Sequence, residues 1–256
     1  MQRRRCRRNV LERRAVRAVT VRGASIAGVP VLIATPTASV DERRMRRCPA
    51  VLWMHGFRAD ALAHVVELER CATLGFFAVG VDAVDHGARS SATLLERLQH
   101  SGGGALPVML DIMEATVREL PALIDVLVTE HAVDRIRVSL VGISMGGFLA
   151  YRAIAAGIPL RSVVALLGSP EWPGRTSAHR SLVAFRDVAL LSITAEHDVS
   201  VPPSAVHRLH EALGCAPTRS TACRHHELRG AGHLTTAAQW AEAMTETMAW
   251  LERYGR

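Results

Sequence analysis

Short apolar runs alternate with longer amphipathic segments along most of the chain. Each run is about as long as one strand, and several are bounded by glycine or proline, which is typical of buried strands. The segments between them carry apolar residues at helical spacing. The expected strands lie at 16–23, 29–36, 50–56, 76–83, 136–142, 161–168, 188–198 and 221–228, and the expected helices at 59–74, 106–129, 145–156, 202–213 and 235–254.

This order of elements predicts an α/β fold. Strands that alternate with helices form βαβ units, and these build a mostly parallel sheet, here of about eight strands, with helices on both faces. The first two expected strands have only a turn near Gly28 between them, so we expect them to form an antiparallel edge. The sequence shows no repeat, no low-complexity linker and no change of composition. We therefore expect one domain over residues 15–256, preceded by a basic, flexible tail at 1–14.

Composition agrees with a globular domain. Hydrophobic residues make up 49% of the 256 residues and charged residues 21%. No apolar run approaches the roughly 20 residues that a membrane-spanning helix needs, so no membrane span is expected. The five cysteines are scattered and include no C-x-x-C pair, which argues against a disulfide framework or a zinc site. A reducing cytoplasm is the expected location.

The formal charge of +7 is concentrated near the amino terminus. All 31 basic residues are arginine, and nine of them fall within the first 22 positions, so the remainder is nearly neutral. A basic tail can bind phosphates or anionic membranes. It can equally be a solvated extension, or the product of an over-extended start site in an arginine-biased genome. No apolar segment follows the arginines, so the tail does not resemble a secretory signal.

The sequence GISMG, from Gly142 to Gly146, is the first candidate for catalysis. An apolar strand is expected before it and a helix after it. A sharp strand-to-helix turn strains the backbone at the central Ser144 and needs small neighbours, which explains a glycine two residues away on each side. The same pattern also fits an incidental serine in a glycine turn. A serine hydroxyl is a weak nucleophile, so the catalytic interpretation requires a base elsewhere in the chain.

His233, in the sequence GAGHLTT, is the candidate base. Imidazole titrates in the range needed to take a proton from serine and return it. The chain has 12 histidines, and the alternative is a surface histidine in a glycine loop. His225 and His226 lie within an expected strand, whereas His233 follows that strand and faces the same edge of the sheet as Ser144.

Asp198, in TAEHDVSVPP, is the candidate partner of His233. A carboxylate at the end of the preceding strand would orient the imidazole and stabilise its cation. Glu196 is the nearest rival, and its position nearer the strand fits a surface role better. The chain order Ser144, Asp198, His233 is that of the α/β-hydrolase arrangement.

The sequence MHGF, from Met54 to Phe57, ends the third expected strand. Acyl transfer passes through a tetrahedral oxyanion, which two backbone N–H groups can stabilise. We expect these donors to be Met145, the residue after the serine, and Phe57. His55 and Gly56 would then shape the loop without taking part in acid–base chemistry.

With MHGF, DAVDHGARS (82–90), GISMGG and GAGH, the chain resembles the α/β-hydrolase superfamily from about residue 15 to its end. It is most similar to small bacterial carboxylesterases related to dienelactone hydrolases and to prolyl-oligopeptidase-type serine peptidases. The resemblance implies that Asp82, Asp85, His86 and Gly87 shape the pocket and support it without doing chemistry. An Asp85–His86 dyad is the alternative, but neighbouring residues on a loop rarely face each other.

The chain departs from this pattern in two ways. Only about twenty residues separate the expected strands at 161–168 and 188–198, so no large lid is expected. Within that segment Trp172, and with it Phe185, either lines an acyl pocket or anchors the loop. Dienelactone hydrolases proper resemble this chain but typically have a cysteine nucleophile, so Ser144 disfavours their specific substrate.

The sequence therefore predicts a serine hydrolase that acts on short- to medium-chain carboxylic esters, with neither a metal nor an organic cofactor. A thioesterase, amidase or peptidase would use the same residues. A non-catalytic binding protein of this fold is a further hypothesis, as is a protein whose arginine tail docks it to nucleic acid or membrane. The expected partner is a small ester and not nucleic acid. The oligomeric state and the physiological ester do not follow from the sequence.

Overall fold

The described parts of the computed structural model are residues 18–37, 47–102, 104–174, 176–214 and 222–256. Their strands form one eight-stranded sheet in the order β1-β2-β4-β3-β5-β6-β7-β8. The strands are β1 (Val19–Ile26), β2 (Val29–Pro36), β3 (Cys48–Met54), β4 (Phe77–Val81), β5 (Val133–Ile143), β6 (Ser162–Leu166), β7 (Ala189–Ala195) and β8 (Cys223–Leu228). All neighbours from β4 to β8 pair in parallel. The predicted α/β fold is confirmed.

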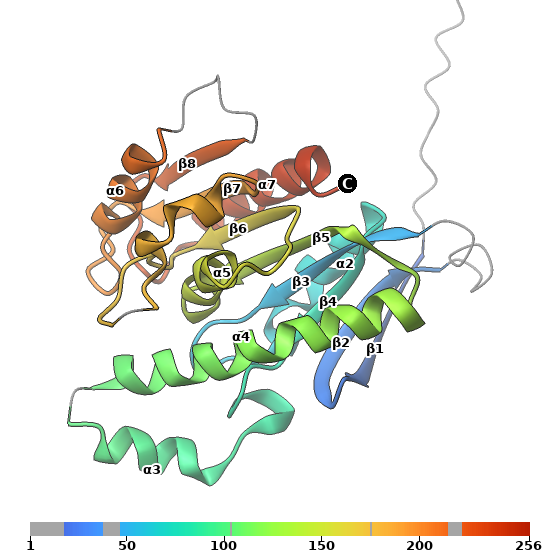
Figure 1. Cartoon of the computed structure of the whole chain (residues 1–256), viewed down its shortest axis with the longest axis horizontal. Coiled ribbons are helices and arrows are strands. Elements are labelled where there is room, and N and C mark those ends of the chain that lie inside the picture. Colours follow the sequence, from blue (N-terminus) through green and yellow to red (C-terminus); the bar gives the residue numbers. More distant parts are fainter. Residues whose placement is uncertain (1–17, 38–46, 103, 175, 215–221) are drawn as a thin grey trace, which may run out of the picture.

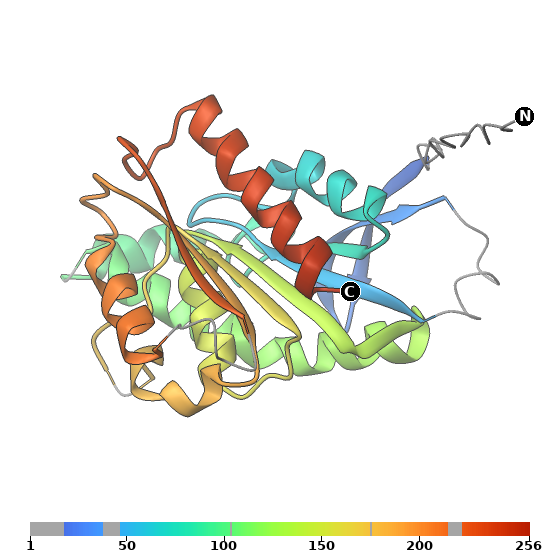
Figure 2. The same ribbon diagram turned by 90° about the horizontal axis from the view of Figure 1, so that it is seen from above.

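Helices cover both faces of this sheet (Figures 1 and 2). The α-helices are α2 (Val65–Thr73), α3 (Ala92–His100), α4 (Ala105–Glu130), α5 (Met145–Ala155), α6 (Ser204–Ala212) and α7 (Ala237–Tyr254). Short 3₁₀ segments are η1 (Ala61–His64), η2 (Gly87–Arg89), η3 (Ala178–Arg180) and η4 (Leu182–Phe185). Helices α2 and α7 pack on one face, and α4, α5 and α6 pack on the other. The core therefore lies in two layers, one on each side of the sheet.

The predicted antiparallel edge is present. Strands β1 and β2 pair antiparallel along their whole length, and β2 also pairs antiparallel with β4. The two-residue turn between β1 and β2 has positive φ at both positions, 52° at Ala27 and 79° at Gly28. This turn geometry matches the right-handed twist of a two-stranded hairpin.

Helix α3 was absent from the expected elements. It follows η2 and joins α4 through a loop, and the two helices form a hairpin that projects from the body of the protein (Figure 1). None of its residues is fully buried, and Leu95 is mostly exposed. The helix is amphipathic, but it is only nine residues long and projects from the core, so it is a small element in the pattern along the chain.

The connection from β6 to β7 is as short as expected. Between residues 167 and 188, the described part of this connection contains only the 3₁₀ segments η3 and η4. No large lid is therefore present there. Among the described residues, no helix is long and apolar enough to cross a membrane. The arginine tail at 1–14 lies outside the described residues, so the predicted domain boundary at residue 15 stays a prediction.

The cysteines differ in bonding state. Cys48 and Cys71 are thiols, but Cys223 is disulfide-bonded. The sequence argued against a disulfide framework and made no prediction for Cys223 itself. Spacing along the chain reveals pairs that are close in sequence, whereas a disulfide needs only that the fold bring two sulfur atoms together.

Candidate active site

Ser144 lies where β5 ends and α5 begins, and its backbone is strained there. Its φ of 54° and ψ of −113° lie outside the regions that residues with a side chain normally adopt. The turn can close because its glycines lack side chains. A Cβ on Gly142 would lie 1.9 Å from the Gly146 oxygen, and one on Gly146 would lie 2.3 Å from the Met54 oxygen. The predicted turn is present, with Ser144 at its apex.

Backbone hydrogen bonds hold the strained serine in place. The Ser144 N–H donates to the carbonyl of Leu166 at the end of β6, at 2.8 Å. The Phe148 N–H donates to the Ser144 carbonyl at 3.0 Å, which begins the hydrogen bonding of α5. Both peptide groups of Ser144 are therefore fixed, one by the sheet and one by the helix.

His233 and Asp198 form a hydrogen-bonded chain with Ser144. The Ser144 Oγ lies 2.9 Å from His233 Nε2, and His233 Nδ1 lies 2.7 Å from Asp198 Oδ2. An ionised carboxylate can only accept, so the Nδ1–H group of His233 donates a hydrogen bond to Asp198. The Nε2 is then left to accept from the Ser144 hydroxyl. The three residues, which are far apart in sequence, thus meet in the arrangement that nucleophilic catalysis needs.

The loops after β7 and β8 run side by side, and this brings Asp198 and His233 together. Beyond the last strand residues, the Glu196 N–H donates to the Leu228 carbonyl at 3.1 Å, and the His197 N–H donates to the Ala231 carbonyl at 2.8 Å. Asp198 then turns inward and is only 3% exposed. Its Oδ1 accepts from the N–H groups of Ser200 and Val201, at 2.9 and 2.8 Å.

Glu196, the rival of Asp198, points elsewhere. Its carboxylate accepts from the Gly230 N–H at 2.8 Å and from Arg229 at 3.3 Å. These interactions lower the pKa of Glu196, the Gly230 hydrogen bond contributing most. Glu196 therefore ties the β8 loop to β7, while Asp198 occupies the position next to the imidazole.

The loop after β3 lies directly against the serine. A Cβ built on Gly56 would be 3.6 Å from the Ser144 Cβ, so the backbone of this loop borders the hydroxyl. Met145 is buried in an apolar cluster against which Phe57 packs. The two residues predicted to hold an oxyanion therefore flank Ser144 from two different elements.

Two buried histidines connect this loop to the one after β4. The Ala83 N–H donates to His55 Nε2 at 3.0 Å, which leaves His55 Nδ1 to donate to the Gly56 carbonyl at 2.8 Å. The Arg58 N–H likewise donates to His86 Nε2 at 2.9 Å, and His86 Nδ1 donates to the Val84 carbonyl at 2.9 Å. Burial lowers the pKa of His55, which keeps its ring neutral.

Asp82 and Asp85 hold separate parts of the backbone. Asp82 accepts from the N–H groups of Ala61 and Ala88, both at 2.9 Å. Gly87 has a φ of 55° and lies so close that a Cβ would be 2.3 Å from the Asp82 Cγ. Asp85 faces α3, where it accepts from Ser91 at 2.9 Å and from Arg97 at 2.8 Å.

An Asp85–His86 dyad is therefore not formed, since both ring nitrogens of His86 are bonded to backbone groups. In the structure, His55, Asp82, Asp85 and His86 bind and shape the loops around Ser144 and do not lie in its hydrogen-bonded chain.

Comparison with known proteins agrees with this architecture. The sequence model of the dienelactone hydrolase family matches residues 31–245, which is most of the chain.

The chain belongs to the dienelactone hydrolase family.

A curated relative, "Putative esterase YitV" of Bacillus subtilis, is 28% identical to this family member over 156 residues. The alignment covers 60% of the chain but only 56% of that relative's length. Among solved structures, TT1662 from Thermus thermophilus superposes with a TM-score of 0.73 at 22% identity, covering 93% of this chain and 99% of that one. A puromycin-hydrolyzing peptidase of Mycobacterium tuberculosis superposes with a TM-score of 0.69 at 17% identity, covering 92% of this chain and 40% of that one. At these identities the solved structures show a shared fold.

Trp172 anchors its loop in this family member. It is buried, its backbone N–H donates to Ser177 Oγ at 2.9 Å, and its indole N–H donates to Thr176 Oγ1 at 3.3 Å. Its ring packs against Phe148 of α5 at a centroid distance of 6.1 Å. Phe185 is fully buried beside Tyr151. Of the two roles that the sequence left open for Trp172 and Phe185, these contacts favour that of an anchor.

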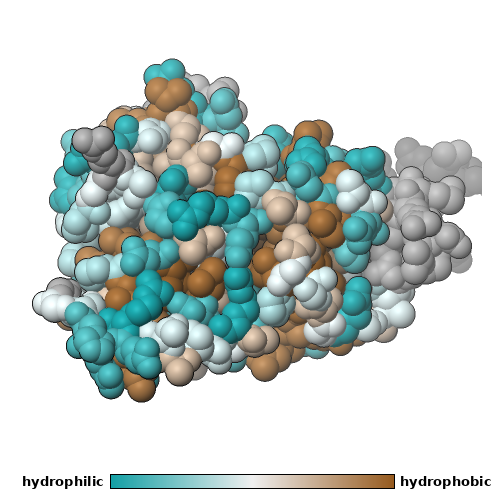
Figure 3. Space-filling view, turned by 60° about the horizontal axis from the view of Figure 1, so that its bottom comes forward, coloured by the Kyte–Doolittle hydropathy of each residue, from teal (hydrophilic) through white to brown (hydrophobic). Residues whose placement is uncertain are grey.

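The α3–α4 hairpin lies next to the predicted oxyanion residues. Leu94 and Leu98 of α3 pack, together with Phe57, on the cluster that contains Met145. Their spacing of four residues was the sequence signal that could have revealed α3. On the side of the molecule where α3 and α4 come forward, apolar patches lie between polar ones (Figure 3).

Two exposed apolar residues at the site were also not predicted. Val199 follows Asp198 directly and Leu234 follows His233, and their side chains are 91% and 94% exposed. Single exposed apolar residues are common on protein surfaces. These two are candidates for substrate contact because they directly follow Asp198 and His233 in the sequence.

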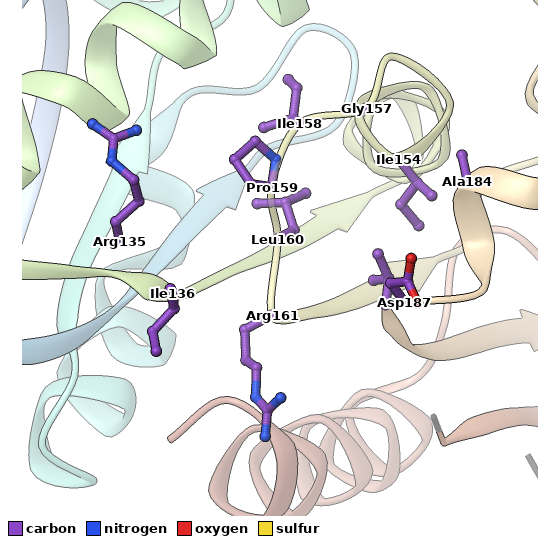
Figure 4. Close-up of a pocket in the computed structure, with 11 residues that line it drawn as sticks. Arg135, Ile136, Ile154, Gly157, Ile158, Pro159, Leu160, Arg161, Ala184 and Asp187 are labelled. Atoms are coloured by element: carbon purple, nitrogen blue, oxygen red, sulfur yellow. The ribbon is translucent and has the colours of Figure 1, made fainter. Parts of the chain in front are cut away.

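A pocket of about 540 Å³ lies at the other edge of the sheet (Figure 4). Its lining comes from the start of β5, the α5–β6 connection and the segment before β7, and includes Ile136, Leu160 and Asp187. These positions are the amino ends of parallel strands, whereas Ser144 follows the carboxyl end of β5. The pocket is therefore separate from the candidate active site.

Proposed function

We propose that this chain is a serine hydrolase that cleaves short- to medium-chain carboxylic esters through an acyl-enzyme intermediate. The observation that carries the proposal is the continuous chain from Ser144 Oγ to His233 Nε2, at 2.9 Å, and from His233 Nδ1 to Asp198 Oδ2, at 2.7 Å. Membership of the dienelactone hydrolase family supports a hydrolase. The similarity to a protein named as an esterase supports the ester class.

In the first half of the reaction, Ser144 Oγ bonds to the ester carbonyl carbon while its proton moves to His233 Nε2. The carbonyl electron pair moves onto the oxygen and forms the tetrahedral oxyanion. When this intermediate collapses, the bond to the alcohol oxygen breaks, and the alcohol leaves with the proton from Nε2. Asp198 keeps the ring oriented and stabilises its cation throughout.

In the second half, water attacks the acyl-enzyme and His233 takes its proton. Collapse of the second tetrahedral intermediate breaks the bond to Ser144 Oγ, which recovers the proton, and the carboxylic acid leaves. The residues of the chain supply every proton transfer, so no cofactor or metal enters these steps. The oxyanion donors in this proposal are the backbone N–H groups of Phe57 and Met145. One such donor typically contributes about 3–4 kcal/mol to transition-state stabilisation.

The surroundings of the serine favour a small, apolar acyl group. Val199 and Leu234 are exposed beside the site, and Leu94 and Leu98 of α3 pack beside Phe57. Apolar side chains of this kind bind alkyl groups by burying them from water. The absence of a large insertion between β6 and β7 in the described residues argues against interfacial activation on lipid.

An amidase, peptidase or thioesterase would use the same three residues. The similarity in fold to a puromycin-hydrolyzing peptidase is the observation that favours a peptidase over a thioesterase. Matched p-nitrophenyl ester and p-nitroanilide substrates with the same acyl group distinguish esterase from peptidase activity. We expect the ratio of kcat/KM to favour the ester by far more than the uncatalysed hydrolysis rates do, and a ratio that favours the anilide would overturn the ester assignment.

The decisive test is a p-nitrophenyl ester series of increasing acyl length on wild type and Ser144→Ala. We expect wild-type turnover to peak at short chains and to fall by about 10⁴-fold or more in the variant. An organophosphonate probe should label Ser144 alone, as mass spectrometry would show. Full turnover by Ser144→Ala, with wild-type folding by circular dichroism, would contradict the mechanism. Absence of turnover in wild type would instead favour a non-catalytic binding protein.

The arginine tail is tested separately. Deletion of residues 1–14 should leave ester hydrolysis unchanged, because the candidate site is built from residues of the sheet and its loops. Salt-dependent nucleic-acid affinity of the full chain that disappears on deletion would instead support docking to nucleic acid through the tail.

A further inference from the structure

A cluster of potential metal ligands lies between α6 and β8, outside the candidate active site. It consists of His207 on α6 and of His225 and Glu227 on β8. One possible ligand atom from each of the three lies within 4.8 Å of the other two. His225 and Glu227 are two positions apart on a strand, so both point to the face on which α6 packs. Figure 1 shows α6 beside β8.

The spacing of the cluster suits a small transition-metal ion. His207 Nε2 lies 3.1 Å from Glu227 Oε2. Ligand bonds of about 2.0–2.2 Å in a tetrahedral zinc site place neighbouring ligand atoms roughly 3.3–3.5 Å apart. The imidazole and carboxylate are therefore near the separation that a shared ion would set. The rings of His207 and His225 are 4.8 Å apart between centroids, and the half-exposed His207 has room to adjust.

His225 is oriented as a metal-binding histidine would be. Its Nε2 lies 2.7 Å from Oγ1 of the buried Thr194, so Nδ1 is the ring nitrogen left for a ligand bond. Metal-bound histidines commonly donate their second ring N–H to an oxygen in this way.

We propose that His207, His225 and Glu227 form a binding site for a divalent transition-metal ion such as Zn²⁺. Two imidazole nitrogens and one carboxylate oxygen suit Zn²⁺ and not Mg²⁺ or Ca²⁺, which prefer oxygen ligands. Water would complete the tetrahedron. None of these residues takes part in the Ser144–His233–Asp198 chain, so the site is independent of the proposed hydrolase activity.

The position of the cluster indicates a stabilising role. Helix α6 follows the Asp198 loop, and β8 leads into the loop that carries His233. An ion held by both elements would link them and favour the folded state by mass action. At a free concentration 100 times the dissociation constant, such linkage should raise the melting temperature by about 5–10 °C for a chain of this size.

The test is a Zn²⁺ titration of the full chain without a histidine tag, by isothermal titration calorimetry at pH 7.5. We expect one ion per chain, and binding at least tenfold weaker in both His207→Ala and Glu227→Gln. His207 is half exposed, so its variant should fold normally. His226→Ala is the matched control, since His226 lies on the same strand but pairs with Glu242 at 2.8 Å. It should bind like wild type. Co²⁺ should show the strong visible absorption of a tetrahedral site only where His207 and Glu227 are intact.

A second arm separates this site from the candidate active site. His233→Ala should retain the Zn²⁺ stoichiometry and affinity of wild type. Loss of binding in His233→Ala together with unchanged binding in His207→Ala would place the ion at the active site and overturn the proposal. An absence of binding to wild type, or equal affinities in wild type and His207→Ala, would also overturn it.

Discussion

Three histidines near the same edge of the sheet use their ring nitrogens in two different ways. His55 and His86 each accept a backbone N–H and donate to a backbone carbonyl, so both nitrogens are occupied by the chain itself. His233 instead has a serine hydroxyl on one nitrogen and a buried carboxylate on the other. A histidine bonded to backbone on both sides supports a loop, whereas one that joins two reactive side chains can move a proton. The residues are identical, and only their partners distinguish the roles.

The first prediction tests this contrast directly. His233→Ala should lower kcat for p-nitrophenyl acetate by about 10⁴-fold or more, because Ser144 loses its base. Its melting temperature should stay within about 2 °C of wild type, since the ring is part-exposed. Stopped assays and differential scanning calorimetry measure both quantities.

His55→Gln is the matched comparison. It should remove part of a buried hydrogen-bond pair and cost about 1–3 kcal/mol of stability, while kcat falls by about tenfold or less. If His55→Gln abolished activity in the folded protein and His233→Ala did not, the assignment of roles would be reversed.

The second prediction compares Asp198, the carboxylate bonded to His233, with Asp82, which is bonded to backbone. Asp198→Asn should lower kcat by about 10³–10⁴-fold, because an amide can donate to Nδ1 and favour the wrong tautomer of His233. Asp82→Asn should instead act on stability, since Asp82 accepts from two backbone N–H groups and faces the crowded turn at Gly87. Measured kcat values and urea unfolding midpoints for both variants distinguish an effect on activity from an effect on stability. Equal losses of activity in the two variants would argue against a catalytic role for Asp198 and a purely supporting role for Asp82.

The third prediction tests whether the exposed Leu234 contacts the acyl group of the substrate. Leu234→Ser should raise KM for a butyrate ester by about three- to tenfold with little change in kcat, because it removes apolar contact without touching the reacting groups. The effect on an acetate ester should be smaller. Val183→Ser is a suitable control, as Val183 is also exposed but lies in η4. A KM that is independent of acyl length in Leu234→Ser would show that this residue does not contact the acyl chain.

The smallest expected effect concerns pH. The folded-state pKa of His55 lies below its unfolded value of about 6.5, mainly because burial disfavours the charged ring. The unfolded chain therefore binds more protons as pH falls through 6.5. The stability that the neutral ring contributes is present above this pH and is lost below it.

We accordingly expect the melting temperature of wild type to fall more steeply between pH 7 and pH 5 than that of His55→Gln. Calorimetry at half-unit pH steps measures the two slopes. Parallel slopes would mean that His55 binds its proton equally in the folded and unfolded chains.

Much of the fold follows from local pattern. The strands that form the centre of the sheet are buried on both faces, so their apolar runs are continuous and easily recognised, as in Leu190 to Ala195. Helix α3 was missed because it is partly solvated and short, and its two packed leucines contact a cluster built from distant segments.

The sequence by itself pointed to the residues that we propose carry the chemistry. Glycines on both sides of Ser144 are required by a turn that leaves no room for side chains, and the order Ser144, Asp198, His233 follows the order of the strands. Only the tertiary structure shows the contacts that separate neighbouring candidates. Asp198 and not Glu196 lies beside His233, Trp172 is bonded within its own loop, and His233 is the histidine that is hydrogen-bonded to Ser144. The physical reason is that a side chain's role depends on the partners of its polar atoms, and these come from segments far away in the chain.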